Sequence, residues 1–483
     1  MLETLKPERV FYYFEEISKI PRASWHTGEI ASYLENFAAA HQLSCQRDEY
    51  DNIAIFKKAS PGYEELPAVI LQGHTDMVAE QEEGWHHNFQ NDGICLRIKD
   101  DYVLADHTTL GADDGIAIAY ALAILEDDSL PHPPLEVLLT SNEEVALTGA
   151  ENLDPSMIRG KYLINLDSEE EGFLLCGCAG GINVETHIPV RYTDTTARCF
   201  NVTLSGLKGG HSGQEISKPR ANANKLMGRF LFELKEKFPC LLVSLKGGQK
   251  HNVIAAGATA VIALDSDTKD DFTAAVKNFQ DTLRREYAGE DDGVTVQCTD
   301  LGEQEVSALH PVSMEKVIFF LTHQPHGVIK MSGTVSNMPE TSANAAVVSL
   351  DEEEFFALTS IRSSLESAKE YLGGQIGYLT EFLGGEYVKN AGYPAWEYEE
   401  HSPLRDLACR VYQEMFQKTL QVVTIHAGLE CGLLKDKAPH LDCISLGPDI
   451  LDIHSPRERL CISSTKRMWE FLLALLENMK TKF

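Results

Sequence analysis

The protein has 483 residues, which is enough for two domains that each bury a hydrophobic core. Its share of hydrophobic residues, 43%, and of charged residues, 24%, is ordinary for a globular protein, but its formal net charge of -31 is not. A surface this acidic repels nucleic acid and anionic membranes, so neither is expected as a partner.

The N-terminal segment MLETLKPERVFYYFEE is charged from its third residue and lacks the apolar core of a signal peptide. The longest apolar run, GIAIAYALAIL at 115–125, is about half as long as a membrane span. Eleven cysteines are scattered from Cys45 to Cys461, without the paired CxxC halves of a zinc knuckle. These features predict a cytoplasmic protein whose cysteines are reduced core residues.

Short apolar runs alternate with helical patterns over much of the chain. Strands are predicted at 67–73, 134–140, 161–166 and 441–447, and the clearest helices at 114–126 and 464–479. Continuous apolar strands that alternate with helices are typical of a mostly parallel sheet sandwiched by helices. The predicted fold class is therefore α/β.

The middle of the chain has a different pattern. An amphipathic helix is predicted around 222–237, and segments such as ATAVIALD and FFALTSIRS alternate more loosely, as strands of an antiparallel sheet with one exposed face do. We therefore predict an inserted α+β lid domain at 189–390, between the two parts of one α/β domain at 1–188 and 391–483. No internal repeat stands out in the sequence.

Two adjacent carboxylates, Glu143 and Glu144, follow the predicted strand at 134–140, and no Lys or Arg lies within ten residues of them. Like charges side by side repel each other, and burial strengthens the repulsion. A bound metal ion would supply the missing positive charge.

Other polar residues also follow predicted strands or begin the helix after them, namely His74, Asp76, Asp113, Asp167 and His454. In open α/β sheets ligands bind outside the carboxyl ends of the strands, so these side chains are expected to converge. Histidines with carboxylates suit zinc or manganese better than calcium.

Charge counting favours two metal ions. Three carboxylates, Asp113, Glu144 and Asp167, with one bridging hydroxide would balance two divalent cations, which leaves Glu143 to accept a proton from the water. Each residue also has an ordinary structural explanation, for example Asp113 as a helix N-cap, and only their joint position favours the metal site. The run at 169–171, three glutamates, is interpreted as a solvated acidic segment.

These residues lie in segments that resemble the di-zinc exopeptidases, the family of aminoacylase, glutamate carboxypeptidase and carnosinase. The segments span nearly the whole chain: LQGHTDMV, TTLGADDGI, EVLLTSNEE, LINLDSEEEG, CGCAGG, LKGGHSG, NANKL, HAGLECGL and HSPRERL. The resemblance implies a zinc exopeptidase-like fold, a lid that also mediates a homodimer, and hydrolysis of unblocked dipeptides, Xaa-His and others, by a water activated between two divalent metals.

The resemblance also assigns the metal ligands. His74 and Asp167 would bind one ion, Glu144 and His454 would bind the other, and Asp113 would bridge the two. Zinc is the expected metal, with cobalt or manganese as alternatives.

Three further assignments concern the surroundings of the metals. Asp76 would orient the His74 ring, and Glu143 would be the general base. The family pattern has Asn where this chain has Asp114, so an effect of this carboxylate on metal affinity is an open question. The resemblance also implies a non-proline cis peptide bond at this junction.

The remaining assignments concern the substrate. His211 would stabilise the oxyanion, within one subunit or across a dimer, unless it only hydrogen-bonds its own glycine-rich turn. Arg362 would bind the dipeptide carboxylate, with help from Asn252. The alternative explanation for Arg362 is that it only forms an ion pair at the surface. His426 and Glu430 would line the pocket near the free amine.

Other functions remain open at this point. An N-acyl amino-acid deacylase or a carboxypeptidase would use the same metal core, and a catalytically silent metal-binding scaffold would keep the fold, although it would have no need of Glu143. A serine nucleophile elbow and a phosphate-binding loop are both missing from the sequence.

Overall fold

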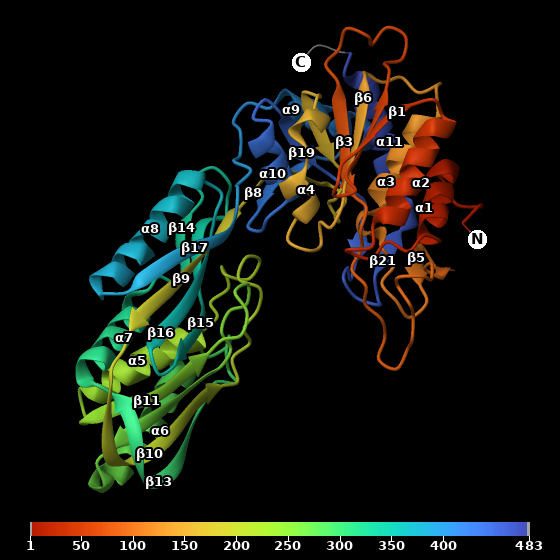
Figure 1. Cartoon of the computed structure of the whole chain (residues 1–483). Helices are drawn as coiled ribbons and strands as arrows, with labels where there is room; N and C mark the ends of the chain where they lie inside the picture. Colours follow the sequence, from red (N-terminus) through yellow and green to blue (C-terminus); the bar gives the residue numbers. More distant parts are fainter. Residues whose placement is uncertain (1, 481–483) are drawn as a thin grey trace. The chain divides into compact units, whose positions relative to one another are not determined.

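A computed structural model of the protein describes residues 2–480, which fold into two compact units (Figure 1). The first unit runs up to Cys178 and also contains Trp396–Thr424 and the chain from Leu429 onward; the second contains Ala179–Ala395 and Ile425–Gly428. The sequence placed these boundaries at 188 and 390. The first observed boundary comes earlier because strand β9 (Gly180–Pro189) pairs with two strands of the second unit.

The first unit is built on an eight-stranded sheet with the order β1-β2-β6-β3-β7-β19-β8-β18. Its four central strands are parallel and all their residues are buried, which explains their continuous apolar runs. They are the four strands predicted from the sequence, so the α/β class is confirmed. The strands are β1 (Ser44–Arg47), β2 (Ile53–Lys57), β3 (Val69–His74), β6 (Leu135–Thr140), β7 (Tyr162–Asn165), β8 (Phe173–Cys178), β18 (Gln421–Ile425) and β19 (Asp442–Ser445).

Helices and a small second sheet complete this unit. The apolar run at 115–125 lies in α3, whose residues up to Leu125 are all buried, and α3 packs against α1 and β3 as a core helix. Within residues 2–480, no helix is both long and apolar enough to span a bilayer. The helices are α1 (Glu8–Ser18), α2 (Gly28–Ala40), α3 (Ala112–Glu126), α4 (Thr148–Asn152), α9 (Pro403–Phe416), α10 (Glu430–Lys437) and α11 (Ile462–Asn478), and the small sheet contains β4 (Leu96–Lys99), β5 (Tyr102–Ala105), β20 (Ile450–Leu451) and β21 (Arg459–Cys461).

The second unit contains an antiparallel sheet with the main order β13-β10-β12-β11-β15-β16-β9-β17, and β14 pairs with β15 at its side. Four helices belong to the same unit, and they share one hydrophobic core with the strands. Its elements are β10 (Tyr192–Ser205), α5 (Ala223–Lys235), β11 (Cys240–Gly247), β12 (Ala258–Leu264), α6 (Lys269–Glu286), β13 (Thr295–Leu309), α7 (Pro311–His323), β14 (Gly327–Met331), β15 (Pro339–Leu350), β16 (Glu354–Ser363), α8 (Glu366–Phe382) and β17 (Glu386–Tyr393).

This strand order reveals an internal repeat. From β10 to β13 the chain forms a β-α-β-β-α-β motif. A second motif with the same order of elements consists of β9, α7, β15, β16, α8 and β17. The first motif is inserted into the second, between β9 and α7. The two halves join where β11 pairs with β15. No repeat stands out in the sequence, because two halves can share a strand order without sharing a residue pattern.

Candidate metal centre

Five side chains from separate segments of the first unit meet at the carboxyl ends of its parallel strands. His74 is the last residue of β3, Glu144 and Asp167 follow β6 and β7, Asp113 lies in the first turn of α3, and His454 lies between β20 and β21. Since parallel strands end at the same edge of a sheet, this placement follows from the fold.

Asp113 lies between two histidines. Its Oδ1 is 3.1 Å from Nε2 of His74, and its Oδ2 is 3.1 Å from Nε2 of His454. Each histidine faces one further carboxylate: His74 Nε2 lies 3.4 Å from Asp167 Oδ1, and His454 Nε2 lies 3.0 Å from Glu144 Oε1. The cluster thus consists of two donor sets that share one carboxylate.

Protonation equilibria in the cluster are strongly displaced. Burial raises the pKa of Asp167 to about 7, although the nearby His74 opposes this shift. Hydrogen bonds to Asp113 and Glu144 raise the pKa of His454 to about 11. Both shifts show that the buried carboxylates favour positive charge beside them.

The donor set fits divalent metal ions. Ligand atoms within 4.8 Å of one another form two groups, one of His74, Asp113 and Glu144 and the other of His74, Asp114 and Asp167. Imidazole nitrogens together with a few carboxylate oxygens are the ligands that zinc and similar ions prefer. The residues present are therefore suited to two metal ions.

Asp76 connects the His74 ring to the backbone of Glu143. Its Oδ1 lies 3.4 Å from His74 Nδ1 and accepts a 2.9 Å hydrogen bond from the Glu143 N–H, while its Oδ2 accepts one of 2.8 Å from the Ser24 hydroxyl. Burial raises the pKa of Glu143 well above its usual value. One carboxylate thus fixes both a candidate ligand and the candidate base.

Asp114 points toward the end of β3 rather than away from the site. The peptide bond between Asp113 and Asp114 is cis, as the family resemblance implied. Asp114 Oδ2 accepts a 3.2 Å hydrogen bond from the His74 N–H, and a Cβ at Gly73 would lie only 2.4 Å from the same oxygen. The glycine therefore makes room for this extra carboxylate.

Two buried charged residues that the sequence did not single out hold the start of α3. The carboxylate of Glu458 accepts hydrogen bonds of 2.7 to 3.0 Å from three backbone N–H groups, those of Leu110, Gly111 and Ala112. Arg22 donates to the carbonyl oxygen of Gly111, just before α3, and to those of Thr75 and Asp76, the latter two at 3.1 and 2.9 Å. Glu458 falls in the segment HSPRERL, which the resemblance did include, whereas nothing in the pattern around Arg22 marks it.

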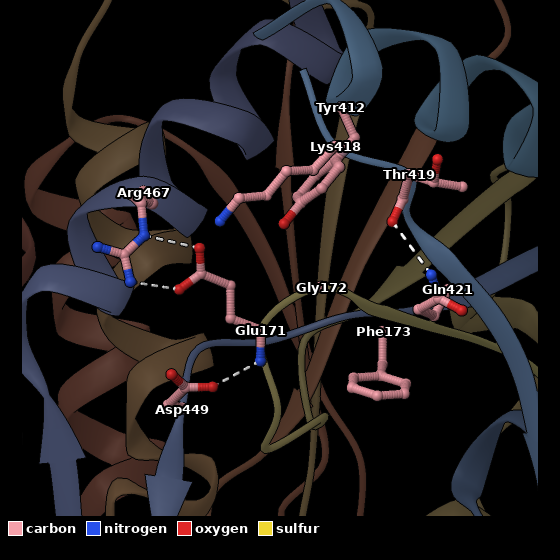
Figure 2. Close-up of a pocket in the computed structure, with 9 residues that line it drawn as sticks. All are labelled: Glu171, Gly172, Phe173, Tyr412, Lys418, Thr419, Gln421, Asp449 and Arg467. Carbon is pink, nitrogen blue, oxygen red and sulfur yellow. Dashed lines mark hydrogen bonds and ion pairs between the residues drawn. The ribbon is translucent and has the colours of Figure 1, made fainter. Parts of the chain in front are cut away.

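The interpretation of 169–171 as a solvated run is wrong for two of its three glutamates. Figure 2 shows Glu171 paired with Arg467 at the side of a cavity of about 600 Å³; Nε and Nη2 of the arginine donate to its two carboxylate oxygens, at 2.7 and 2.6 Å. Its backbone N–H donates to Asp449 at 2.8 Å. Glu169 is partly buried, and burial together with Asp113 raises its pKa to about 8. The loop folds back onto α11 and the segment after β19, which the local sequence does not indicate.

A second cluster lies within the second unit, around Gly213. A Cβ at Gly213 would be 3.1 Å from His211 Cε1, 3.2 Å from Arg362 Nε and 2.5 Å from the carbonyl oxygen of His426. The Asn252 carbonyl accepts a 2.9 Å hydrogen bond from the N–H that follows His211. Both halves of the internal repeat therefore contribute to one cluster in one chain.

His211 is bonded to its own turn and also lies beside a cation. Its Nδ1 accepts hydrogen bonds from the backbone N–H groups of Gly213 and Gln214, at 3.3 and 3.2 Å. Burial, with Arg362 nearby, lowers its pKa. In the neutral ring the proton then resides on Nε2, which can donate to a ligand.

Glu430 and His426 belong to different units although they are only four residues apart. Glu430 Oε2 accepts hydrogen bonds from Gln72 Nε2 and the Thr140 hydroxyl, at 2.6 and 2.7 Å, within the first unit. Burial raises its pKa to about 8. His426 lies in the second unit beside Ser342.

Comparison with known proteins identifies the family of the chain. The model of peptidase family M20/M25/M40 matches residues 70–478. The chain belongs to this family.

Relatives of this M20 chain extend over its whole length. It is 37% identical to the cytosol non-specific dipeptidase of Escherichia coli, over 100% of this chain and 99% of that protein. The crystal structure of aminoacylhistidine dipeptidase from Vibrio alginolyticus is 34% identical and superposes with a TM-score of 0.92 over 99% of this chain and 98% of that one. An aminopeptidase of Bacillus cereus shares only the fold, with a TM-score of 0.57 at 15% identity over 98% of this chain and 99% of that one.

Proposed function

We propose that the protein is a metallo-dipeptidase that hydrolyses unblocked dipeptides, Xaa-His among them, with two divalent ions, zinc in the first place and cobalt or manganese as alternatives. The observation that carries the proposal is Asp113, each of whose carboxylate oxygens faces a different histidine. The names of two full-length relatives, a non-specific dipeptidase and an aminoacylhistidine dipeptidase, support the substrate class.

In this proposal His74 and Asp167 would hold one ion, Glu144 and His454 would hold the other, and Asp113 would contribute to both. When bound, the ions would polarise the scissile carbonyl group and make a water molecule more acidic.

Glu143 accepts the proton of the attacking water and then delivers it to the departing amine. Burial raises its pKa, which makes it a stronger proton acceptor than an exposed glutamate. Asp76 keeps the His74 ring and the Glu143 backbone in place.

The proposed substrate contacts use the remaining predicted residues, among them His426, which lines the pocket near the free amine. His211 donates from Nε2 to the developing oxyanion. Arg362 binds the dipeptide carboxylate, and Asn252, which lies next to His211, assists it. Glu430 binds the free amine, which its buried carboxylate and unpartnered Oε1 support.

We also propose that the protein works in the cytoplasm as a homodimer formed through the second unit. All eleven cysteines are free, which suits a reducing compartment, and the Escherichia coli relative is named a cytosol enzyme. Three aromatic side chains on one face of α8, those of Tyr371, Tyr378 and Phe382, are 69% to 74% exposed and support an interface there.

A dipeptide panel before and after chelation tests the function. Ala-His and other free dipeptides should be hydrolysed, activity should disappear with a chelator, and it should return with added zinc, cobalt or manganese. N-acetyl amino acids and dipeptides with a blocked amine should react about 10- to 100-fold more slowly, since a lost charged contact is worth roughly 1.5–3 kcal/mol. Faster release from N-acetyl amino acids than from dipeptides would instead identify a deacylase.

A further inference from the structure

Two polar atoms in the cluster around Gly213 are buried without a hydrogen-bond partner. These are Nε of Arg362 and Nδ1 of His426, on side chains of residues only 8% and 4% exposed. The opposite end of each side chain is held: Arg362 Nη1 donates to the Tyr393 hydroxyl at 2.6 Å, and His426 Nε2 lies 2.7 Å from the Ser342 hydroxyl.

We propose that Tyr393 and Ser342 are positioning residues, which hold Arg362 and His426 so that their free N–H groups together bind the carboxylate of the dipeptide. This inference rests on the proposed function, and it moves His426 from the amine end of the substrate to the carboxylate end.

The sheet register explains how Tyr393 reaches Arg362. Arg362 on β16 lies opposite Gly181 on β9, and Gly181 lies opposite Tyr393 on β17. Directly opposed residues project from the same face of a sheet, so the glycine leaves space there for the tyrosine ring. A Cβ at Gly181 would come within 2.5 Å of that ring.

The same row of residues continues to Ser342, which lies opposite Arg362 on β15. Its hydroxyl therefore also projects from this face, where it meets the His426 ring. A Cβ at Gly428 would lie 2.8 Å from Tyr393 Cε2, so the tyrosine ring is enclosed from a second side. The two hydroxyl groups thus have fixed positions beside the two donors.

The charge around Arg362 indicates an anionic ligand. Over the described part of the chain, residues 2–480, no acidic side chain forms an ion pair with it. A buried guanidinium without a counter-charge is costly, and a carboxylate ligand would remove this cost with hydrogen bonds to a planar donor.

His426 suits the second position as a neutral donor. Burial and the nearby Arg362 lower its pKa to about 4, so the ring carries a single proton at neutral pH. When the Ser342 hydroxyl donates to Nε2, that proton resides on Nδ1, the free atom. In this tautomer the Nδ1–H is free to bind a carboxylate.

The test combines three variants with two substrates, Ala-His and its C-terminal amide. For Ala-His, Tyr393→Phe and Ser342→Ala should each raise KM about tenfold, the effect of losing one charge-assisted contact, while kcat stays within about twofold. For the amide, which has no carboxylate, kcat/KM should stay unchanged. Ser342→Thr, which keeps the hydroxyl, should retain the KM of the unmodified enzyme. The control for Tyr393→Phe is Tyr50→Phe, the same change at an exposed tyrosine.

Other outcomes separate this inference from the proposed function. If Arg362→Met abolishes the preference for the acid over the amide but Tyr393→Phe and Ser342→Ala change nothing, the positioning role is wrong and the proposed function stands. Equal losses of kcat/KM on both substrates would indicate a purely structural role and would also overturn the inference. If Arg362→Met itself leaves the preference intact, the carboxylate site lies elsewhere and the proposed role of Arg362 fails.

Discussion

Replacing Glu143 with Ala is expected to reduce kcat for Ala-His by about 10²- to 10⁴-fold, the usual contribution of a general base, while two metal ions per chain remain bound. The reason is that Glu143 lies beside the candidate ligands, with its backbone fixed by Asp76, but belongs to neither donor set. Steady-state kinetics and the metal content of the same preparation, measured by plasma mass spectrometry, check both parts.

A matched control is Glu170→Ala, since Glu170 is an exposed carboxylate on a loop of the same unit. This variant should keep full activity. Activity of Glu143→Ala within twofold of the control would rule out the base, and loss of a metal ion would show that Glu143 is a ligand instead.

Replacing Asp113 with Asn is expected to lower the metal content below one ion per chain and to reduce activity by at least about 10³-fold, because this change removes the charge shared by both donor sets. Asp114→Asn offers a comparison at the next position. The amide oxygen of Asn can still accept from the His74 N–H, so we expect both ions to remain and activity to stay within about fivefold.

The comparison decides which of the two neighbouring carboxylates matters for the metals. If Asp114→Asn loses metal as completely as Asp113→Asn, then Asp114 is itself a ligand, as its proximity to His74 and Asp167 allows. If Asp113→Asn keeps its full metal content, the proposal that Asp113 is a ligand of both ions is wrong.

The sequence was sufficient to predict the central sheet and the residues at its edge. Buried parallel strands such as β3 and β6 have a continuous apolar pattern, and each polar residue directly after them lies at the same edge. His74, Glu144 and Asp167 could therefore be grouped without a structure. The role of each depends on the metals and is still a proposal.

Features that depend on long-range packing could not be predicted in this way. Arg22, through the Gly111 carbonyl, and Glu458 hold the start of α3 from far along the chain, and the pairing of Glu171 with Arg467 joins segments almost 300 residues apart. The row formed by Ser342, Arg362, Gly181 and Tyr393 depends on strand register, which periodicity alone does not fix.

The most direct test of the central claim is anomalous diffraction from crystals of the zinc-loaded protein. Two peaks should appear on either side of Asp113, about 3.5–4 Å apart, each about 2 Å from one of its carboxylate oxygens and from one of the two histidines, His74 or His454. A single peak, or two peaks that do not share Asp113, would contradict the account.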